Sequence, residues 1–258
     1  MRLIAAMVMA AAPGQPLWAD ANTLEAIKNL KPNTALDIGA FEWEKPAGGP
    51  KIGSVLDYSG MVYDPHHNRM LVFGGGHSTT WTDAVYALDL TTFQWTSLYQ
   101  PSPYAIYQPD NMQASFWKDS LGPDYPRPVG RHSYDLLVVP QQRKELFMLR
   151  AGTAGSKVTN RLGFKTYDSM MGGAWGVMDL QTHQWETIPR INNDFGRLGG
   201  VAEYDPISEK IIVLGVRQAY AVDVETREAE VIIPKLPVSA YSGSMVYCPE
   251  DDSMIGIS

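Results

Sequence analysis

Four short apolar runs between residues 58 and 98 constrain the fold of this chain more than any other feature. Each run is rich in β-branched and aromatic residues and is bounded by turn-forming residues, which is typical of β-strands. The runs are Gly60–Tyr63, Met70–Phe73, Ala84–Leu88 and Gln94–Leu98. Turn formers separate them, including the Gly74–Gly76 triplet between the second and third runs. The pattern predicts four sequential antiparallel strands.

The pattern recurs along the chain, and recurrence is stronger evidence than a single copy. A second copy lies within residues 131–185, a third within 199–231, and two runs of a fourth within 241–257. An aspartate ends the third run of each complete copy: Asp89, Asp179 and Asp223. The residues six positions later are Trp95, Trp185 and Ala229. Repeated units of four antiparallel strands predict an all-β protein, a β-propeller of four-stranded blades.

The repeats resemble those of the kelch family, which carry a glycine pair after the second strand and a Trp in the fourth. The first copy has the full glycine signature, the second has Ala151-Gly152, and the third has a single Gly215. The resemblance covers residues 58–258 and extends to the propeller of galactose oxidase and to secreted bacterial kelch proteins with a similar GGGH sequence. It implies a kelch-type propeller.

Three and a half blades are too few for a closed ring, which takes about four to eight. We therefore expect residues 58–258 to be part of a longer propeller, an incomplete ring here, with the missing C-terminal blades as its partner. The alternative is a four-bladed ring closed by an N-terminal strand. Residues 20–57 are predicted to form a short helix at 22–30, because Leu24, Ile27 and Leu30 are at helical spacing, and a lone strand at 34–43.

The N-terminus resembles a bacterial secretory signal peptide, residues 1–19, with a basic start, a short apolar core and small residues before Asp20. The core is too short to span a bilayer permanently. We expect a secreted or periplasmic protein with no membrane association after cleavage, and a retained N-terminal anchor is the alternative. The net charge of −7 argues against a nucleic-acid partner. The single cysteine, Cys248, excludes an internal disulfide.

Two long insertions, 99–130 and 153–173, indicate which face carries the function. Strands alternate in direction, so the loops between first and second strands share one face with the loops between third and fourth strands. These loops are all short, whereas both insertions fall on the opposite face. Long loops on one face of a regular scaffold are commonly functional. The sequence therefore predicts the binding site on the insertion-bearing face.

Polar and aromatic residues of that face are the candidate site residues. His, Tyr and Arg together can remove a proton next to a carboxylate, as in polysaccharide lyases. The catalytic candidates are His77, Arg131, His132 and Tyr167. The ligand-binding candidates are Trp81, Arg197, Arg217 and Tyr241. In kelch repeats, Arg and His before the first strand also form hydrogen bonds between blades, so Arg131 and His132 have a structural alternative.

Aromatic residues of the insertions offer flat apolar faces that can stack on sugar rings, or they pack the long loops onto the blades. They are Trp81, Tyr104, Tyr107, Trp117 and Tyr125. No metal site and no cofactor is predicted. The adjacent His66 and His67 are expected to be solvated in a turn of the opposite face. That face is also expected to hold Cys248, away from His77 and His132, so the copper chemistry of galactose oxidase, which needs a Cys–Tyr crosslink, is not expected.

The resulting hypothesis is an exported propeller that binds an extracellular glycan or small sugar on its insertion-bearing face. A polysaccharide lyase is one alternative and a protein-interaction scaffold is another. The sequence leaves open whether the chain is an enzyme.

Overall fold

The computed structural model describes most of the chain and places its secondary structure. The described residues are 21–37, 41, 43–49, 55–74, 82–113, 116–118, 126–150, 173–189, 191–192, 195, 199–241 and 243–257. Within them the protein is all-β, with one α-helix, α1 (Ala21–Lys28), and two 3-10 turns, η1 (Tyr104–Ile106) and η2 (Pro109–Asn111). No helix of the described part is long and apolar enough to cross a membrane. The predicted signal peptide, residues 1–19, lies outside the described residues.

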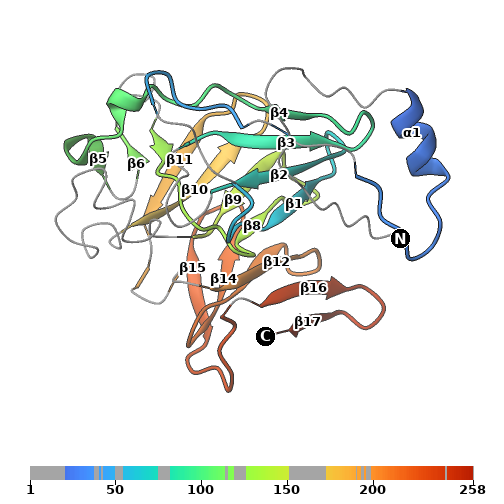
Figure 1. Ribbon diagram of the computed structural model, residues 1–258. Helices are drawn as coiled ribbons and strands as arrows, with labels where there is room; N and C mark the ends of the chain where they lie inside the picture. The colour runs from blue at the N-terminus through green and yellow to red at the C-terminus, as the bar shows by residue number, and fades with distance from the viewer. Residues whose placement is uncertain are drawn as a thin grey trace.

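Three four-stranded antiparallel sheets form the body of the molecule (Figure 1). The first contains β1 (Met61–Asp64), β2 (Arg69–Phe73), β3 (Val85–Asp89) and β4 (Trp95–Ser97). The second contains β8 (Leu137–Val138), β9 (Glu145–Met148), β10 (Ala174–Asp179) and β11 (Trp185–Pro189). The third contains β12 (Val201–Asp205), β13 (Lys210–Leu214), β14 (Ala219–Asp223) and β15 (Ala229–Ile233). A two-stranded sheet follows, formed by β16 (Ser244–Cys248) and β17 (Ser253–Ile257). The predicted strands are confirmed in all four copies.

The turn between the third and fourth strands has the same geometry in all three sheets. A carboxylate oxygen of its first residue accepts hydrogen bonds from the backbone N–H groups two and three residues later, at 2.7 to 2.9 Å. These residues are the predicted Asp89, Asp179 and Asp223. Four positions after each acid the backbone is left-handed, at Phe93, His183 and Arg227. The aspartate recurs because it fixes this turn.

The first strands of successive sheets lie next to one another. Parallel bridges join Ser59 to Tyr134 and Asp135 to Val201, and β12 contacts β16. Figure 1 shows β1, β8, β12 and β16 one below the other. Each sheet therefore extends away from a shared row of first strands. Corresponding ends of these strands lie on the same side of the row in every copy.

The core lies between neighbouring sheets. One buried cluster, which includes Phe147, Trp175 and Tyr220, fills the space between the second and third sheets. Another includes Phe73, Met178 and Trp185 and joins the first sheet to the second. The second sheet is therefore buried on both faces. This burial accounts for the nearly continuous apolar runs of its inner strands, β9 and β10.

The N-terminal segment packs on the first sheet. Helix α1 confirms the predicted helix, but residues 34–37, 41 and 43, which are the described part of the predicted lone strand, form no strand. Phe41 and Trp43 instead contact Tyr86 of β3 and Trp95 of β4. Burial of these rings explains the apolar character of the segment without strand pairing, so the prediction of a lone strand is wrong for these residues.

The first insertion contains a small sheet that the sequence did not predict. Its strands are β5 (Met112–Gln113), β6 (Phe116–Trp117) and β7 (Arg127–Pro128). Phe116 packs against Gly176 of β10, where a Cβ would lie 2.7 Å from the Phe116 ring. The second insertion, residues 153–173, lies outside the described residues except for Gly173.

Candidate functional site

Ion pairs connect neighbouring turns at the end of the sheets that carries the short turns. Arg143 pairs with Glu145 at 2.5 Å and with Glu225, and Arg227 pairs with Glu145 at 2.5 Å. The pairs join the first turn of the second sheet to the last turn of the third sheet. These turns therefore share one end of the molecule, as the alternation of strand direction predicted.

His66 and His67, in the turn between β1 and β2, both have polar partners. The His66 Nε2 atom lies 2.8 Å from the Arg143 carbonyl oxygen, and the His67 Nδ1 atom lies 2.8 Å from the buried Asp64 carboxylate. Burial raises the pKa of Asp64, but hydrogen bonds from His67 and Arg69 outweigh it, so the net pKa is lowered. His67 is exposed, as expected, while it also pairs with the buried Asp64 carboxylate, and His66 is only partly exposed.

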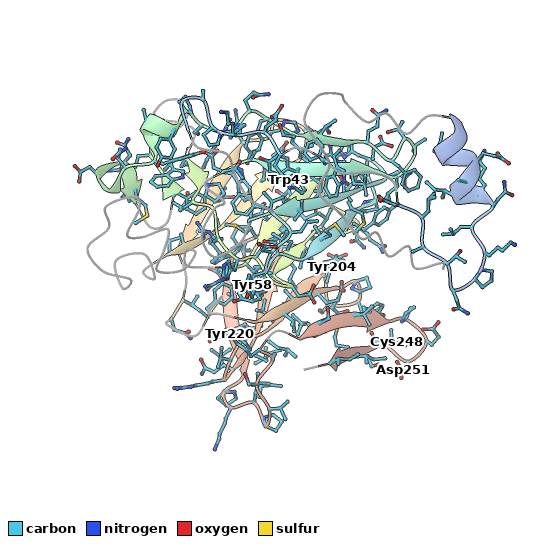
Figure 2. All side chains as sticks on the ribbon, viewed as in Figure 1. Trp43, Tyr58, Tyr204, Tyr220, Cys248 and Asp251 are labelled. Atoms are coloured by element: carbon cyan, nitrogen blue, oxygen red, sulfur yellow. The ribbon has the colours of Figure 1, made fainter. Side chains whose placement is uncertain are left out.

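The opposite end of the first strands gathers four aromatic rings, which we call the tyrosine cluster: Tyr58, His132, Tyr134 and Tyr241. The His132 ring stacks on Tyr58, with 4.7 Å between centroids, and meets Tyr134 edge-on at 5.6 Å. The Tyr134 ring lies 6.3 Å from that of Tyr241. Figure 2 labels Tyr58 in the region where the first, second and third sheets meet. The cluster thus joins the entries to three first strands that are far apart in sequence.

Close backbone contacts hold the cluster together. The Tyr134 N–H donates to the Tyr58 carbonyl oxygen at 2.9 Å, and the Gly60 N–H donates to the Tyr134 carbonyl oxygen at 2.6 Å. Gly74 has a φ of 116°, and a Cβ there would lie 2.0 Å from the Arg131 carbonyl oxygen. A side chain at this position would push the segment that carries His132 away from the first sheet. Gly74, the first glycine of the triplet, is therefore required by its backbone conformation and by the close approach of the Arg131 carbonyl oxygen.

The two outer rings of the cluster face solvent and the histidine does not. Tyr58 is 52% exposed and Tyr241 is 54% exposed, whereas His132 is 3% exposed. The His132 Nδ1 atom lies 3.3 Å from the Tyr134 hydroxyl oxygen. His132 is therefore placed to hold the Tyr58 ring in position, and the exposed rings of Tyr58 and Tyr241 are the surfaces that a ligand can reach.

The carboxyl of Asp135 directly follows Tyr134 of the cluster, and that of Glu203 on β12 lies near Asp135. Burial raises the pKa of Asp135, whose Oδ2 accepts hydrogen bonds from Ser244 Oγ at 2.9 Å and from the Met245 N–H at 3.1 Å. Burial and the nearby charge of Asp135 also raise the pKa of Glu203. Sequence reasoning missed both acids, although a charged residue in an otherwise apolar first strand was a signal for each.

Arg131 has a different role from that of a solvent-facing catalytic residue. Its side chain is fully buried, and the guanidinium donates to the carbonyl oxygens of Val129, Arg150 and Ala174 at 2.8, 2.9 and 3.2 Å. Burial, together with the charge of Arg150, lowers the pKa of Arg131. These bonds link the segments that precede β8, follow β9 and begin β10. The geometry agrees with the structural alternative for Arg131.

The other predicted residues are only partly brought together. Tyr241 belongs to the tyrosine cluster, whereas Arg217 is exposed in the turn after β13, where its carbonyl oxygen accepts a bond from the Leu236 N–H at 2.7 Å. His77, Trp81, Tyr167 and Arg197 lie outside the described residues. Sequence reasoning named neither Tyr58 nor Tyr134 as a site residue, because the alignment of one sheet with the next determines their position.

The described aromatics of the first insertion pack onto the sheets. Tyr107 and Trp117 are each 1% exposed and form a buried cluster with Val129, and Tyr104 packs against it. Tyr125 lies outside the described residues. For Tyr107 and Trp117 the packing role therefore applies, and sugar stacking by these two rings is wrong.

The described residues contain no group of three or more His, Cys, Asp or Glu side chains that could hold a metal ion. Cys248 ends β16, and its thiol lies 3.2 Å from the Glu250 carboxylate. The chain matches no protein-family model, and a search of curated proteins finds no relative of significant similarity.

Proposed function

We propose that this chain is a kelch-type propeller unit that binds an extracellular carbohydrate at the tyrosine cluster. The repeated four-stranded sheets, the repeated aspartate turn and the row of first strands support blades arranged about a common axis. In that arrangement the cluster lies at the mouth of the central channel, on the insertion-bearing face.

The observation that carries the proposal is the pair of solvent-facing tyrosine rings, Tyr58 and Tyr241, held by a buried His132 and by Tyr134. A sugar ring presents C–H groups that pack on an aromatic face, and its hydroxyls need polar partners nearby. The tyrosine hydroxyls and the carboxyls of Asp135 and Glu203 are such partners. Rings that are fixed before binding lose little side-chain entropy when the ligand arrives.

Binding is favoured over turnover because the catalytic candidates that the structure describes, His132 and Arg131, are shielded from solvent. His132 lies beneath Tyr58, and the Arg131 guanidinium is occupied by three carbonyl oxygens. A lyase needs a base within hydrogen-bond reach of the proton that it removes.

Two measurements test the proposal and separate it from its rivals. A glycan array probed with the labelled protein should give hits, and an array without hits favours a protein-interaction scaffold. Incubation with acidic polysaccharides should give no rise in the absorbance of unsaturated uronates. A rise in that absorbance would instead establish the lyase.

A further inference from the structure

A pocket of about 230 Å³ lies between the first and second sheets, away from the tyrosine cluster. It opens between the segment after β4, strand β7 and the turn that leads into β11. The residues that line it include Tyr99, Arg127, Thr182, His183, Gln184 and Trp185. The carbohydrate hypothesis does not involve this pocket.

The pocket contains a buried positive charge. Arg127 is 5% exposed, its guanidinium lies over the Tyr99 ring at 4.1 Å, and one of its N–H groups donates to the Gln100 carbonyl oxygen at 2.6 Å. Among the described residues it forms no ion pair with a carboxylate. Asp83 lies near enough that the Arg127 charge opposes the rise that burial causes in its pKa, but its carboxylate accepts hydrogen bonds from Ser102 and Tyr107 and none from Arg127. A buried guanidinium is ordinarily paired with an anion.

The walls of the pocket are rigid and mostly uncharged. The Trp185 indole N–H donates to the Tyr99 hydroxyl at 2.8 Å, and that hydroxyl donates to the Asp83 carbonyl oxygen at 2.8 Å. Burial, followed by the charge of Arg69, lowers the pKa of His183, which disfavours a second positive charge in the pocket. Arg127 is therefore the cation that a ligand in the pocket meets, beside the aromatic surface of Tyr99 and Trp185.

We propose that this pocket binds a small organic monocarboxylate, with the carboxylate paired to the Arg127 guanidinium. A guanidinium fork matches a carboxylate in geometry, and the aromatic walls suit the carbon skeleton. Pockets for drug-sized ligands are roughly 300–1,000 Å³. The ligand is thus no larger than about one sugar acid.

Titration calorimetry on the whole chain tests the site, with acetate, benzoate and glucuronate as probes and the uncharged glucuronamide as the control for charge. At least one carboxylate should bind with a Kd below about 10 mM, and glucuronamide should bind at least about tenfold more weakly than glucuronate if glucuronate is the ligand. Binding should weaken with added salt, since the pocket is open to solvent. Failure of all three carboxylates to bind would overturn the proposal.

Two variants of the exposed Gln184 keep the test independent of folding. Gln184→Glu adds a negative charge at the rim and should weaken carboxylate binding by roughly threefold to tenfold, whereas Gln184→Lys should strengthen it by a similar factor. Arg127→Gln should abolish binding. Equal affinity in the two Gln184 variants, or unchanged binding in a folded Arg127→Gln protein, would refute a carboxylate site at Arg127.

Discussion

Replacement of Trp185 by alanine should be among the most destabilising single changes in the described part of the chain. The side chain is 6% exposed, its ring lies 5.8 Å from that of Phe73, and its indole N–H donates to the Tyr99 hydroxyl at 2.8 Å. Both partners belong to the first sheet or the segment that follows it, so Trp185 joins the first two sheets. Removal of a buried Trp side chain typically costs ~3–5 kcal/mol in the free energy of unfolding.

Trp95 is the matched control, because it occupies the same fourth-strand position but is only partly buried, against Phe41 and Trp43. Trp95→Ala should cost ~1–2 kcal/mol, since less apolar surface is exposed. The two tryptophans thus share a position in the repeat but differ in burial. Equilibrium urea unfolding followed by circular dichroism measures both.

Trp185→Phe isolates the hydrogen bond. Beyond the cost of the smaller ring, the change should lower the free energy of unfolding by ~0.5–1.5 kcal/mol. The loss is modest because the Tyr99 hydroxyl keeps its hydrogen bond to the Asp83 carbonyl oxygen. A double-mutant cycle with Tyr99→Phe gives that coupling directly. If Trp185→Ala lowered the free energy of unfolding by less than about 1 kcal/mol, the second sheet would not depend on this contact.

Three further predictions follow from single positions. Gly74→Ala should destabilise by more than ~2 kcal/mol, because the new Cβ meets the Arg131 carbonyl oxygen, whereas Gly48→Ala, with φ of 75° and open space, should cost only ~1 kcal/mol; equal costs by urea unfolding would contradict this. The pKa of Asp64 is lowered by folding, so its contribution is full above the ordinary carboxyl pKa and is lost as the pH falls below about 4; Asp64→Asn should flatten the loss of stability on acidification, and an unchanged pH profile would count against it. Mass spectrometry of protein expressed in a bacterial host should find a mature start near Asp20, and recovery of intact chain in the cytosol would argue against export.

The local structure of the repeats was predictable because each element depends on residues close in sequence. Asp89 and its counterparts fix a turn through bonds to N–H groups two and three residues away, and the apolar runs match the strands between these turns. The same reasoning missed β5–β7, which have two residues each and lie in an insertion, where no repeat marks them as the repeat marks the equally short β8. It also read Phe41 and Trp43 as strand residues, because burial against another element and strand pairing favour the same residue types.

The site was harder to predict because it depends on how one sheet is aligned with the next. Tyr58 and His132 stack only because the Ser59–Tyr134 bridge sets the entries of β1 and β8 side by side. The pocket at Arg127 likewise requires the first insertion to fold back between two sheets. Two adjacent candidates, both buried, also differ in their contacts, since the guanidinium of Arg131 donates to backbone carbonyl oxygens while the ring of His132 stacks on Tyr58 of the tyrosine cluster.

The most direct test of carbohydrate binding at the tyrosine cluster is one titration of an array-positive glycan into two double variants. Tyr58→Ala with Tyr241→Ala removes both exposed rings, which precede β1 and β16, and Tyr63→Ala with Tyr247→Ala removes two tyrosines within these strands, near their opposite ends. Tyr63 is 45% exposed, so at that site the control matches the exposure of Tyr58 closely. The first pair should weaken binding by at least about tenfold, since loss of a well-packed aromatic contact costs more than ~1 kcal/mol, and the second should leave it unchanged. Binding that survives loss of Tyr58 and Tyr241 but falls with Tyr63 and Tyr247 would place the site at the other end of the sheets and contradict the proposal.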